Sequence, residues 1–246
     1  VSATASSGLS PSFSIVSGPA TLSGNTVTLT GAGTVVVRAS QAGDATYNAA
    51  TPVDQSFTVA KASQALTFGV LPNKATTDPA FAVSATASSG LSVSFSIVSG
   101  PASILGNTIT LAGTAGTVVV RAAQAGDANY NAATPVDQSF TVGKVNQTVT
   151  FGVLGNKTFE DAPFTVSATA SSSLPVSYSI VSGPATVSGN NVTLTGAGTV
   201  VVRAAQAGDA TYNAATPVDQ SFTVAKANQT LTFGALANKP FAYGDV

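Results

Sequence analysis

The sequence predicts an all-β protein made of tandem β-sandwiches, each with about seven strands. Three observations lead to this prediction. The phrase QAGDATYNAATPVDQSFTV at 41–59 returns at 124–142 with one change and at 206–224 with none. Apolar and polar residues alternate with a period of two, which is typical of half-buried strands. Gly, Pro, Asn and Ser separate these short runs, as the turns of a sandwich require.

The repeat period is 82–83 residues, and Gln41, Gln124 and Gln206 open the three copies of the phrase. The extra residue lies in LAGTAGT at 111–117, where the other copies read LTGAGT. A turn between two strands tolerates such a change. Solenoid repeats are about 20–50 residues long, so this longer period indicates a string of small independent domains.

The first strands of the third copy can be followed along the chain. FTVSATA at 164–170 alternates Phe, Val and Ala with Thr and Ser, so its apolar set forms one face. VSYSIV at 176–181 and NVTLT at 191–195 alternate in the same way, and SGPA at 182–185 breaks the chain between them. Each run is therefore predicted as a strand, and no stretch has the 3.6-residue period of a helix.

The last two strands of this copy are TVVVRAA at 199–205 and QSFTV at 220–224. Arg203 should face water, which places the alternate positions of its strand inside. The residues predicted inside are Val200, Val202, Ala204, Phe222 and Val224. TLTF at 230–233 repeats the alternation with Leu231 and Phe233.

Composition excludes several classes of function. The net charge is −1 and charged residues make up only 8% of the chain, so clustered Lys and Arg for nucleic acid or an anionic membrane surface are missing. Cys and His are absent, so the chain can form no disulfide, no imidazole-based metal site and no Ser-His-Asp triad. No apolar run approaches eighteen residues. We therefore expect no enzyme, no nucleic-acid binding and no membrane insertion in this segment.

Several segments together resemble a known family of repeats. QTLTFGALANK, FTVSATASS, TVSGNNVTLTGAGTVVVRAAQAGDATYNAA and QSFTV are similar to the bacterial immunoglobulin-like repeats called MBG-type. Those repeats occur in tandem in large bacterial surface proteins and adhesins. The resemblance covers essentially the whole chain, in register with its period. It implies immunoglobulin-like sandwiches, an extracellular location at the cell surface, and a spacer or adhesive role.

The resemblance also places the domain boundaries, because the family's domain begins at QTLTF and not at VSATA. Residues 1–60 are then an incomplete repeat that lacks its first strand. Residues 61–143 and 144–225 are complete repeats. Residues 226–246 hold the first strand of a following repeat.

The repeated loop GDATYNAATPVDQ joins the last two strands, and it is the first candidate for a site. We expect it to plug one end of its own domain, with tyrosine hydroxyls bonded to the backbone and asparagine amides bonded within the loop. The residues are Tyr47, Tyr130 and Tyr212 with Asn48, Asn131 and Asn213. The alternative is a binding loop, because binding residues concentrate on loops.

Calcium is a weaker candidate ligand of the same loop. Each copy carries an Asp beside a Gly and a second Asp ten residues later, but calcium takes six to eight oxygens, usually from several carboxylates. A site would need Asp78, Asp161 or Asp245 to approach across a junction. No cofactor is therefore expected.

These features predict a structural stalk or spacer of a long extracellular bacterial repeat protein, in an adhesin or a surface filament. Neighbouring repeats would be its partners, and any cell-surface ligand would bind through another domain. The alternative is a module whose repeated loop binds a glycan or receptor many times weakly. Sugar sites usually offer exposed aromatic platforms, and Trp is absent here.

The two ends of the chain leave a further alternative open. They either reflect a cut through a continuous repeat array or form a joint between copies. In the joint, residues 226–246 would leave their own chain and complete the sheet of residues 1–60 in the next copy, held by Leu231 and Phe233. Such a head-to-tail contact does not close on itself and generates an open filament.

Overall fold

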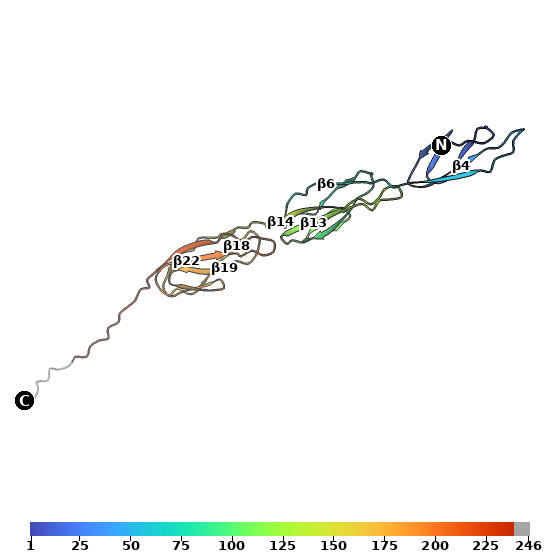
Figure 1. The fold of residues 1–246 in the computed structure, drawn as a ribbon. Coiled ribbons are helices and arrows are strands. Elements are labelled where there is room, and N and C mark those ends of the chain that lie inside the picture. The colour runs from blue at the N-terminus through green and yellow to red at the C-terminus, as the bar shows by residue number, and fades with distance from the viewer. Residues whose placement is uncertain (239–246) are drawn as a thin grey trace, which may run out of the picture. The chain divides into compact units, whose positions relative to one another are not determined.

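The computed structural model describes residues 1–238, and these form strands, turns and extended segments but no helix. None of the described residues therefore lies in a helix that could cross a membrane. The chain divides into two compact units, Val1–Lys144 and Val145–Val246. Figure 1 shows strands grouped along each unit, with β4, β6, β13 and β14 in the first and β18, β19 and β22 in the second.

The second repeat of the first unit contains nine short strands. They are β6 (Leu66–Phe68), β7 (Lys74–Ala75), β8 (Phe81–Ala82), β9 (Ala85–Ala87), β10 (Ser94–Ser99), β11 (Ala102–Leu105), β12 (Thr108–Leu111), β13 (Gly116–Ala123) and β14 (Val136–Gly143). One sheet has the order β10-β13-β14-β7, and the other layer consists of β11-β12-β8 and β6-β9. β6 and β7 together are the first strand and β8 and β9 the second, each interrupted once.

This strand order is immunoglobulin-like. With the seven strands lettered A to G along the chain, one layer is A-B-E-D and the other is C-F-G with the second half of A at its edge. That is the arrangement of a constant-type immunoglobulin domain. The predicted fold class, tandem immunoglobulin-like sandwiches, is confirmed.

The second unit repeats this arrangement. Its strands are β15 (Val149–Phe151), β16 (Lys157–Thr158), β17 (Phe164–Thr165), β18 (Ala168–Ala170), β19 (Ser177–Ser182), β20 (Ala185–Ser188), β21 (Asn191–Leu194), β22 (Gly198–Ala205) and β23 (Val218–Ala225). The sheets are β16-β23-β22-β19, β17-β21-β20 and β15-β18. The inward faces predicted for β22 and β23 are confirmed, because their alternate residues are buried and Arg203 and Thr223 are exposed.

The prediction of one continuous strand over residues 164–170 is wrong. The run divides into β17 and β18 because it changes partners: β17 pairs with β21, and β18 pairs with β15. Between them, Val166 N–H donates to the carbonyl of Asn190 at 2.9 Å. The alternating burial continues through the break, so the predicted faces hold although the strand does not.

The core of each complete repeat lies between its two layers. In the second repeat, Val118 and Val120 of β13 and Phe140 of β14 are buried against Phe68 and Ile109 of the opposite layer. Two aromatic pairs connect the layers, Phe68 with Phe95 and Phe81 with Phe140, each with ring centroids 5.6 Å apart. Such pairs add to the stability that area burial gives.

The first repeat lacks part of this architecture. Its strands are β1 (Ser12–Ser17), β2 (Ala20–Ser23), β3 (Thr26–Leu29), β4 (Gly33–Ser40) and β5 (Val53–Val59). They form a three-stranded sheet, β1-β4-β5, and a hairpin, β2-β3. Residues 1–60 contain no counterpart of β6, β7 or β8, and Phe57 is 41% exposed, whereas its equivalents Phe140 and Phe222 are 2% and 3% exposed.

Candidate functional site: the repeated loop

The loop between the last two strands folds on local hydrogen bonds. In the second repeat, Oε1 of Gln124 accepts from the N–H of Gly126 at 2.5 Å, and Oδ1 of Asp127 accepts from the N–H groups of Asn129 and Tyr130 at 2.7 and 2.8 Å. Gly126 has φ 76°, and a Cβ there would lie 2.4 Å from the carbonyl oxygen of Tyr130. Only glycine fits this turn without strain.

The other two copies of the loop have the same bonds. In the first repeat, Gln41 accepts from Gly43 at 2.5 Å, and Asp44 accepts from Thr46 and Tyr47 at 2.7 and 2.9 Å. These two backbone N–H groups lower the pKa of Asp44 below its ordinary value. In the third repeat, Gln206 accepts from Gly208 at 2.5 Å, and Asp209 accepts from Thr211 and Tyr212 at 2.8 Å each. The loop therefore takes one conformation wherever its sequence occurs.

In the second repeat this loop holds the segment that enters the domain. The N–H of Ala62 donates to the carbonyl of Asn129 at 2.8 Å, and the N–H of Asn131 donates to the carbonyl of Ala62 at 2.9 Å. These bonds form a parallel bridge between Ala62 and Tyr130. Nζ of Lys61 also donates to the carbonyl of Asp127 at 2.5 Å. The entering segment is thus fixed to the loop before its first strand begins.

Gln64 is the centre of this contact. Its Nε2 donates to Oε1 of Gln124 at 2.5 Å and to the carbonyl of Asn131 at 2.7 Å, and its Oε1 accepts from the hydroxyl of Ser89 at 2.5 Å. We call the loop together with this glutamine the entry clamp; it comprises residues 61–64 and 124–131. The clamp connects the entering segment, the last loop and the turn after β9 in a single network.

The third repeat contains the same entry clamp, formed by residues 145–147 and 206–213. Val145 bridges Tyr212, and Nε2 of Gln147 donates to Oε1 of Gln206 at 2.5 Å and to the carbonyl of Asn213 at 2.7 Å. The hydroxyl of Ser172 donates to Oε1 of Gln147. Gln147 and Gln206 are both buried, which satisfied amides allow.

The structure places the predicted loop residues as follows. The asparagines Asn131 and Asn213 contact the entering segment, and Nδ2 of Asn213 also donates to Oδ1 of Asn146 at 2.8 Å. The tyrosines Tyr130 and Tyr212 act through their main chain, and among the described residues their hydroxyls make no hydrogen bond. Tyr47 and Asn48 are exposed, and residues 1–60 contain no entering segment like those that bridge Tyr130 and Tyr212.

Sequence reasoning missed the glutamine of the entering segment. Gln64, Gln147 and Gln229 stand at the same position of SQALTF, NQTVTF and NQTLTF, so the signal was present in the period. One loop difference has a structural role within the first unit. Asn129, which replaces the Thr of the other copies, accepts through Oδ1 from the N–H of Ala32 at 2.9 Å.

The carboxylates considered for calcium are spread over separate contacts. Oδ2 of Asp78 accepts from the N–H of Ala75 at 3.0 Å, and Oδ2 of Asp161 accepts from that of Thr158 at 2.9 Å. Asp54, Asp137 and Asp219 each pair with an arginine. Across residues 1–238, no three acidic side chains gather as a metal ion would need, and Asp245 lies outside the described residues.

Comparison with known proteins gives likeness in architecture alone. No protein-family model matches the chain, and no curated relative is found. A three-domain fragment of mouse protocadherin-24 is 16% identical, with 88% of this chain and 90% of that chain covered and a TM-score of 0.38.

Two further solved structures are similar at the same low level. A four-domain fragment of Drosophila N-cadherin is 13% identical with a TM-score of 0.32, covering 89% of this chain and 66%, just under two thirds, of that chain. The titin I-band fragment I67–I69 is 12% identical with a TM-score of 0.32, covering 89% of this chain and 88% of that one. At these values the likeness says nothing about activity.

Proposed function

We infer that this chain is a structural spacer, a segment of a stalk in an extracellular bacterial surface protein. One observation carries the proposal: each complete repeat fixes both its entering segment and its leaving strand by hydrogen bonds. The entry clamp fixes the first, and the edge of the four-stranded sheet fixes the second. The resemblance to MBG-type repeats supports the extracellular, adhesin-like setting.

The leaving strand pairs in parallel with the second half of the first strand. In the second repeat, β14 pairs with β7 through Val142 with Lys74 and Gly143 with Ala75. In the third repeat, β23 pairs with β16 through Lys157 with Val224. A pull on the two ends of such a parallel pair loads its hydrogen bonds in shear, all together. This suits an element that must transmit tension.

Side-chain bonds extend this parallel edge. Oδ1 of Asn73 accepts from the N–H of Thr141 at 2.8 Å, and Oδ1 of Asn156 accepts from the N–H of Thr223 at 2.9 Å. Nε2 of Gln138 donates to the carbonyl of Phe68 at 2.9 Å. The first and last strands are therefore joined across both layers, which supports a load-bearing role for each complete repeat.

The sequence between successive repeats is short once the clamps are included. β14 ends at Gly143 and the bridge begins at Val145, so Lys144 is the single residue between them. β5 ends at Val59, and the bridge of the second repeat begins at Ala62. Little free chain therefore remains between the elements of successive repeats.

The alternative of a repeated binding loop is less well supported. In the two complete repeats, Oε1 of Gln124 or Gln206 and the carbonyl of Asn131 or Asn213 already accept hydrogen bonds from the glutamine of the entering segment. Removing these partners would leave buried polar groups without hydrogen bonds. A ligand would have to compete with the chain itself.

Single-molecule pulling of the 246-residue chain tests the spacer proposal. We expect two unfolding events that resist force, one for each complete repeat, and a weaker response from residues 1–60. Asn156→Ala, which removes the side-chain bond to Thr223, should lower the force of one event and spare the other. If both complete repeats extended at the low force of an unfolded chain, the proposal would be wrong.

A further inference from the structure

A side chain at the tip of the repeated loop joins the second repeat to the first. Oδ1 of Asn129 accepts from the N–H of Ala32 at 2.9 Å. Ala32 lies in the turn between β3 and β4 of the first repeat, 97 residues earlier in the chain. Both repeats belong to the unit Val1–Lys144, so the bond is a contact between neighbouring repeats inside one compact unit.

The turn of the first repeat is formed by bonds within that repeat. The N–H of Thr30 donates to the carbonyl of Pro19 at 2.8 Å. In the third repeat, the identical turn has the same bond, from Thr195 to Pro184 at 2.9 Å. Because each bond lies inside one repeat, the turn folds without a neighbour and presents the N–H of Ala32 in a fixed position.

Gly31 lets the side chain of Asn129 approach the turn. A Cβ on Gly31 would lie 2.7 Å from Oδ1 of Asn129 and 3.3 Å from Cβ of Pro19. A Cβ on Gly196, the same position of the third repeat, would lie at the same 3.3 Å from Cβ of Pro184. Inside their own repeats the two glycines therefore have equal room. What differs at Gly31 is the side chain of the next repeat, which approaches the backbone as closely as only glycine allows.

The main chain of Asn129 is held independently of this contact. Its N–H donates to Oδ1 of Asp127 at 2.7 Å, and its carbonyl accepts from the N–H of Ala62 in the entering segment at 2.8 Å. The main chain thus binds the segment that enters the domain, while the side chain binds the preceding turn. Because both partners are ordered before they meet, the contact costs little conformational entropy.

Two attachments to the first repeat therefore meet at Asn129. One is covalent and short, because β5 ends at Val59 and the entering segment is bridged at Ala62. The other is the hydrogen bond from Ala32. A repeat that is attached through its linker alone can rotate about that linker, and a second attachment away from the linker restricts this rotation.

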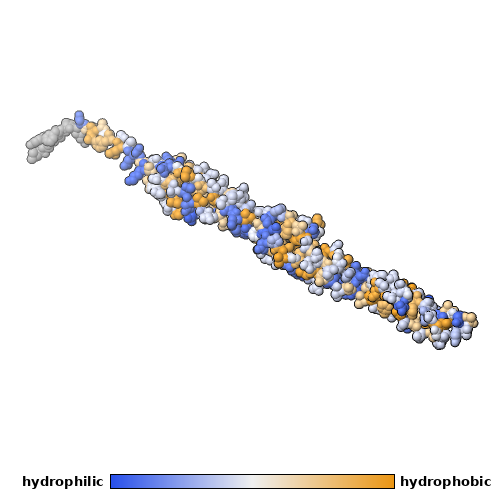
Figure 2. All heavy atoms as spheres, turned by 90° about the horizontal axis from the view of Figure 1, so that it is seen from above, coloured by the Kyte–Doolittle hydropathy of each residue, from blue (hydrophilic) through white to orange (hydrophobic). Residues whose placement is uncertain are grey.

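Charge does little to select the neighbour in this chain. Charged residues make up only 8% of it, and Figure 2 shows hydrophobic and hydrophilic residues interspersed on one face. A hydrogen bond depends steeply on distance and angle, so a single directed bond onto a glycine can fix a geometry that a weak electrostatic field cannot.

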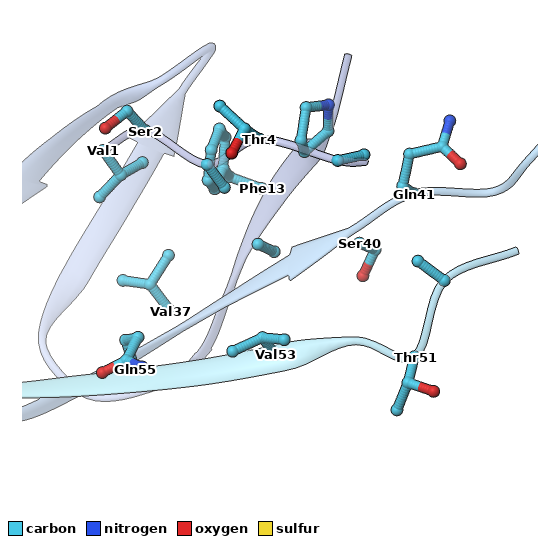
Figure 3. Close-up of a pocket in the computed structure, with 15 residues that line it drawn as sticks. Val1, Ser2, Thr4, Phe13, Val37, Ser40, Gln41, Thr51, Val53 and Gln55 are labelled. Carbon is cyan, nitrogen blue, oxygen red and sulfur yellow. The ribbon is translucent and has the colours of Figure 1, made fainter. Parts of the chain in front are cut away.

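The contact is also separate from the open core of the first repeat. Figure 3 shows the pocket of that core, where Val37 and Val53 are directed towards the segment that carries Val1 and Thr4. None of residues 30–32 lies in the walls of this pocket. The strand that residues 1–60 lack therefore has no part in the contact with Asn129.

We propose that the tip of this loop is a docking surface for the turn of the preceding repeat, and that Asn129, seated on Gly31 and Ala32, sets the orientation of the first two repeats. The residue at this loop position then decides the stiffness of the joint. Asn carries its acceptor far enough to reach the N–H of Ala32, whereas Thr, which stands at this position in the other copies, has a shorter side chain. One substitution in the loop thus converts a fixed joint into a hinge without changing the fold of either repeat.

Hydrogen exchange of the Ala32 amide in the full chain tests the bond. We expect this amide to exchange about two- to tenfold more slowly than that of Ala197, the same position of the third repeat, whose N–H has no hydrogen-bond partner within residues 1–238. Asn129→Thr should remove the protection, and Asn129→Asp, which keeps an acceptor oxygen, should retain it. Equal exchange at Ala32 and Ala197 in the unmodified chain would overturn the proposal.

Asn129→Thr changes the contact without disturbing the loop. Thr211 stands at this position in the third repeat, and its N–H donates to Asp209 at 2.8 Å just as that of Asn129 donates to Asp127. Residual dipolar couplings of the amides then report the orientation. One alignment should describe the first two repeats in the unmodified chain and in Asn129→Asp, and two different alignments should be needed in Asn129→Thr. Separate alignments in the unmodified chain, or a common one in Asn129→Thr, would contradict the proposed joint.

Two glycine variants locate the contact from the other side. Gly31→Ala should loosen the joint, because the added methyl displaces the side chain of Asn129. Gly196→Ala adds the same methyl beside its own proline and should leave the alignment of the first two repeats unchanged. A joint that stayed fixed in Gly31→Ala, or that changed equally in Gly196→Ala, would mean that Asn129 is not seated on this turn.

The joint and the spacer function are tested separately. None of these substitutions lies in β14 or β23, so the two unfolding events expected under force should be the same in every variant. A freely hinged joint in the unmodified chain would thus count against the docking contact and leave the spacer proposal standing.

Discussion

The first repeat and the two complete repeats share nearly the same sequence over their last strand, but not the same burial. Phe57 is 41% exposed in VDQSFTV of the first repeat, whereas Phe222 is 3% exposed in the identical phrase of the third. Phe222 packs edge-on against Phe164 at 5.6 Å, and residues 1–60 contain no counterpart of Phe164. The alternation of the strand decides which face is apolar, but a distant segment decides whether that face is buried.

The repeated loop between the last two strands, unlike the strand, has the same local structure in the first repeat and in the complete repeats. Its internal hydrogen bonds are the same in all three repeats, whether an entering segment is present or not. Those bonds join residues two or three apart, so the turn forms on local chemistry. The comparison separates what nineteen residues can fix alone from what needs the rest of the domain.

The largest effect should come from truncating the aromatic residue of the last strand. Phe222→Ala should cost about 3–5 kcal/mol because the ring is fully buried. Phe57→Ala should cost less than about 2 kcal/mol, since a half-exposed ring leaves little cavity. Repeat-resolved hydrogen exchange in denaturant would measure both. Equal losses at the two positions would show that the first repeat has a closed core in solution.

Thr223→Ala is the matched control for the direction of the face. Thr223 is exposed beside Phe222, so its loss should cost under about 1 kcal/mol. A loss as large as that of Phe222→Ala would mean that the inward and outward faces are misassigned.

Variants of the entry clamp should give the next largest difference in stability loss between a complete repeat and the first repeat. Gln147→Ala removes the donor to Oε1 of Gln206, which keeps its bond from Gly208, and leaves the carbonyl of Asn213 without the glutamine's bond, which should cost about 1–3 kcal/mol. Gln41→Ala in the first repeat removes one bond within the loop, to Gly43, and should cost about 1 kcal/mol or less. Chemical denaturation of the two variants, with the repeats followed separately, would compare them. A clamp that contributes nothing would make the two losses equal.

The sequence was sufficient for the fold class because its strongest signals are local. The period of two placed Val200 and Val202 inside and Arg203 outside, and the structure agrees. It was insufficient for the break between β17 and β18, because a change of strand partner leaves the alternation untouched. It also missed Gln64 and Gln147, whose partners lie about sixty residues away and are joined only by the fold.

One aromatic position tests how far the two complete repeats are interchangeable. The hydroxyl of Tyr178 accepts from the N–H of Ala168 at 2.6 Å, whereas the second repeat has Phe95 at this position. Tyr178→Phe should therefore cost about 0.5–1.5 kcal/mol, and Phe95→Tyr should recover a similar amount if the bond can form there. Denaturation midpoints of both variants would measure this. No change in either would show that water replaces the bond.

The smallest effect on stability should come from the arginine–aspartate pair that all three repeats share. Arg38, Arg121 and Arg203 each hold an aspartate across the last two strands, with Nε to Oδ1 distances of 2.7, 2.8 and 2.8 Å. In each pair the hydrogen bond from the arginine lowers the pKa of Asp54, Asp137 or Asp219. None of these pairs involves the strand that residues 1–60 lack.

The contribution of this ion pair to the free energy of unfolding should therefore depend on pH in the same way in all three repeats. A carboxylate whose pKa is lower in the folded state stabilises the fold above its unfolded pKa of about 3.9, and this stabilisation is lost as pH falls through the folded value. The wild-type chain should thus be slightly more stable than Asp219→Asn at pH 7, and this difference in stability should vanish in acid. Because the pair is exposed, the difference should be small and should shrink in high salt. Denaturant midpoints between pH 7 and pH 2 would follow it. The same small difference should appear for Asp54→Asn. If the first repeat loses more stability in acid than the third, its incomplete core, and not the ion pair, sets its acid stability.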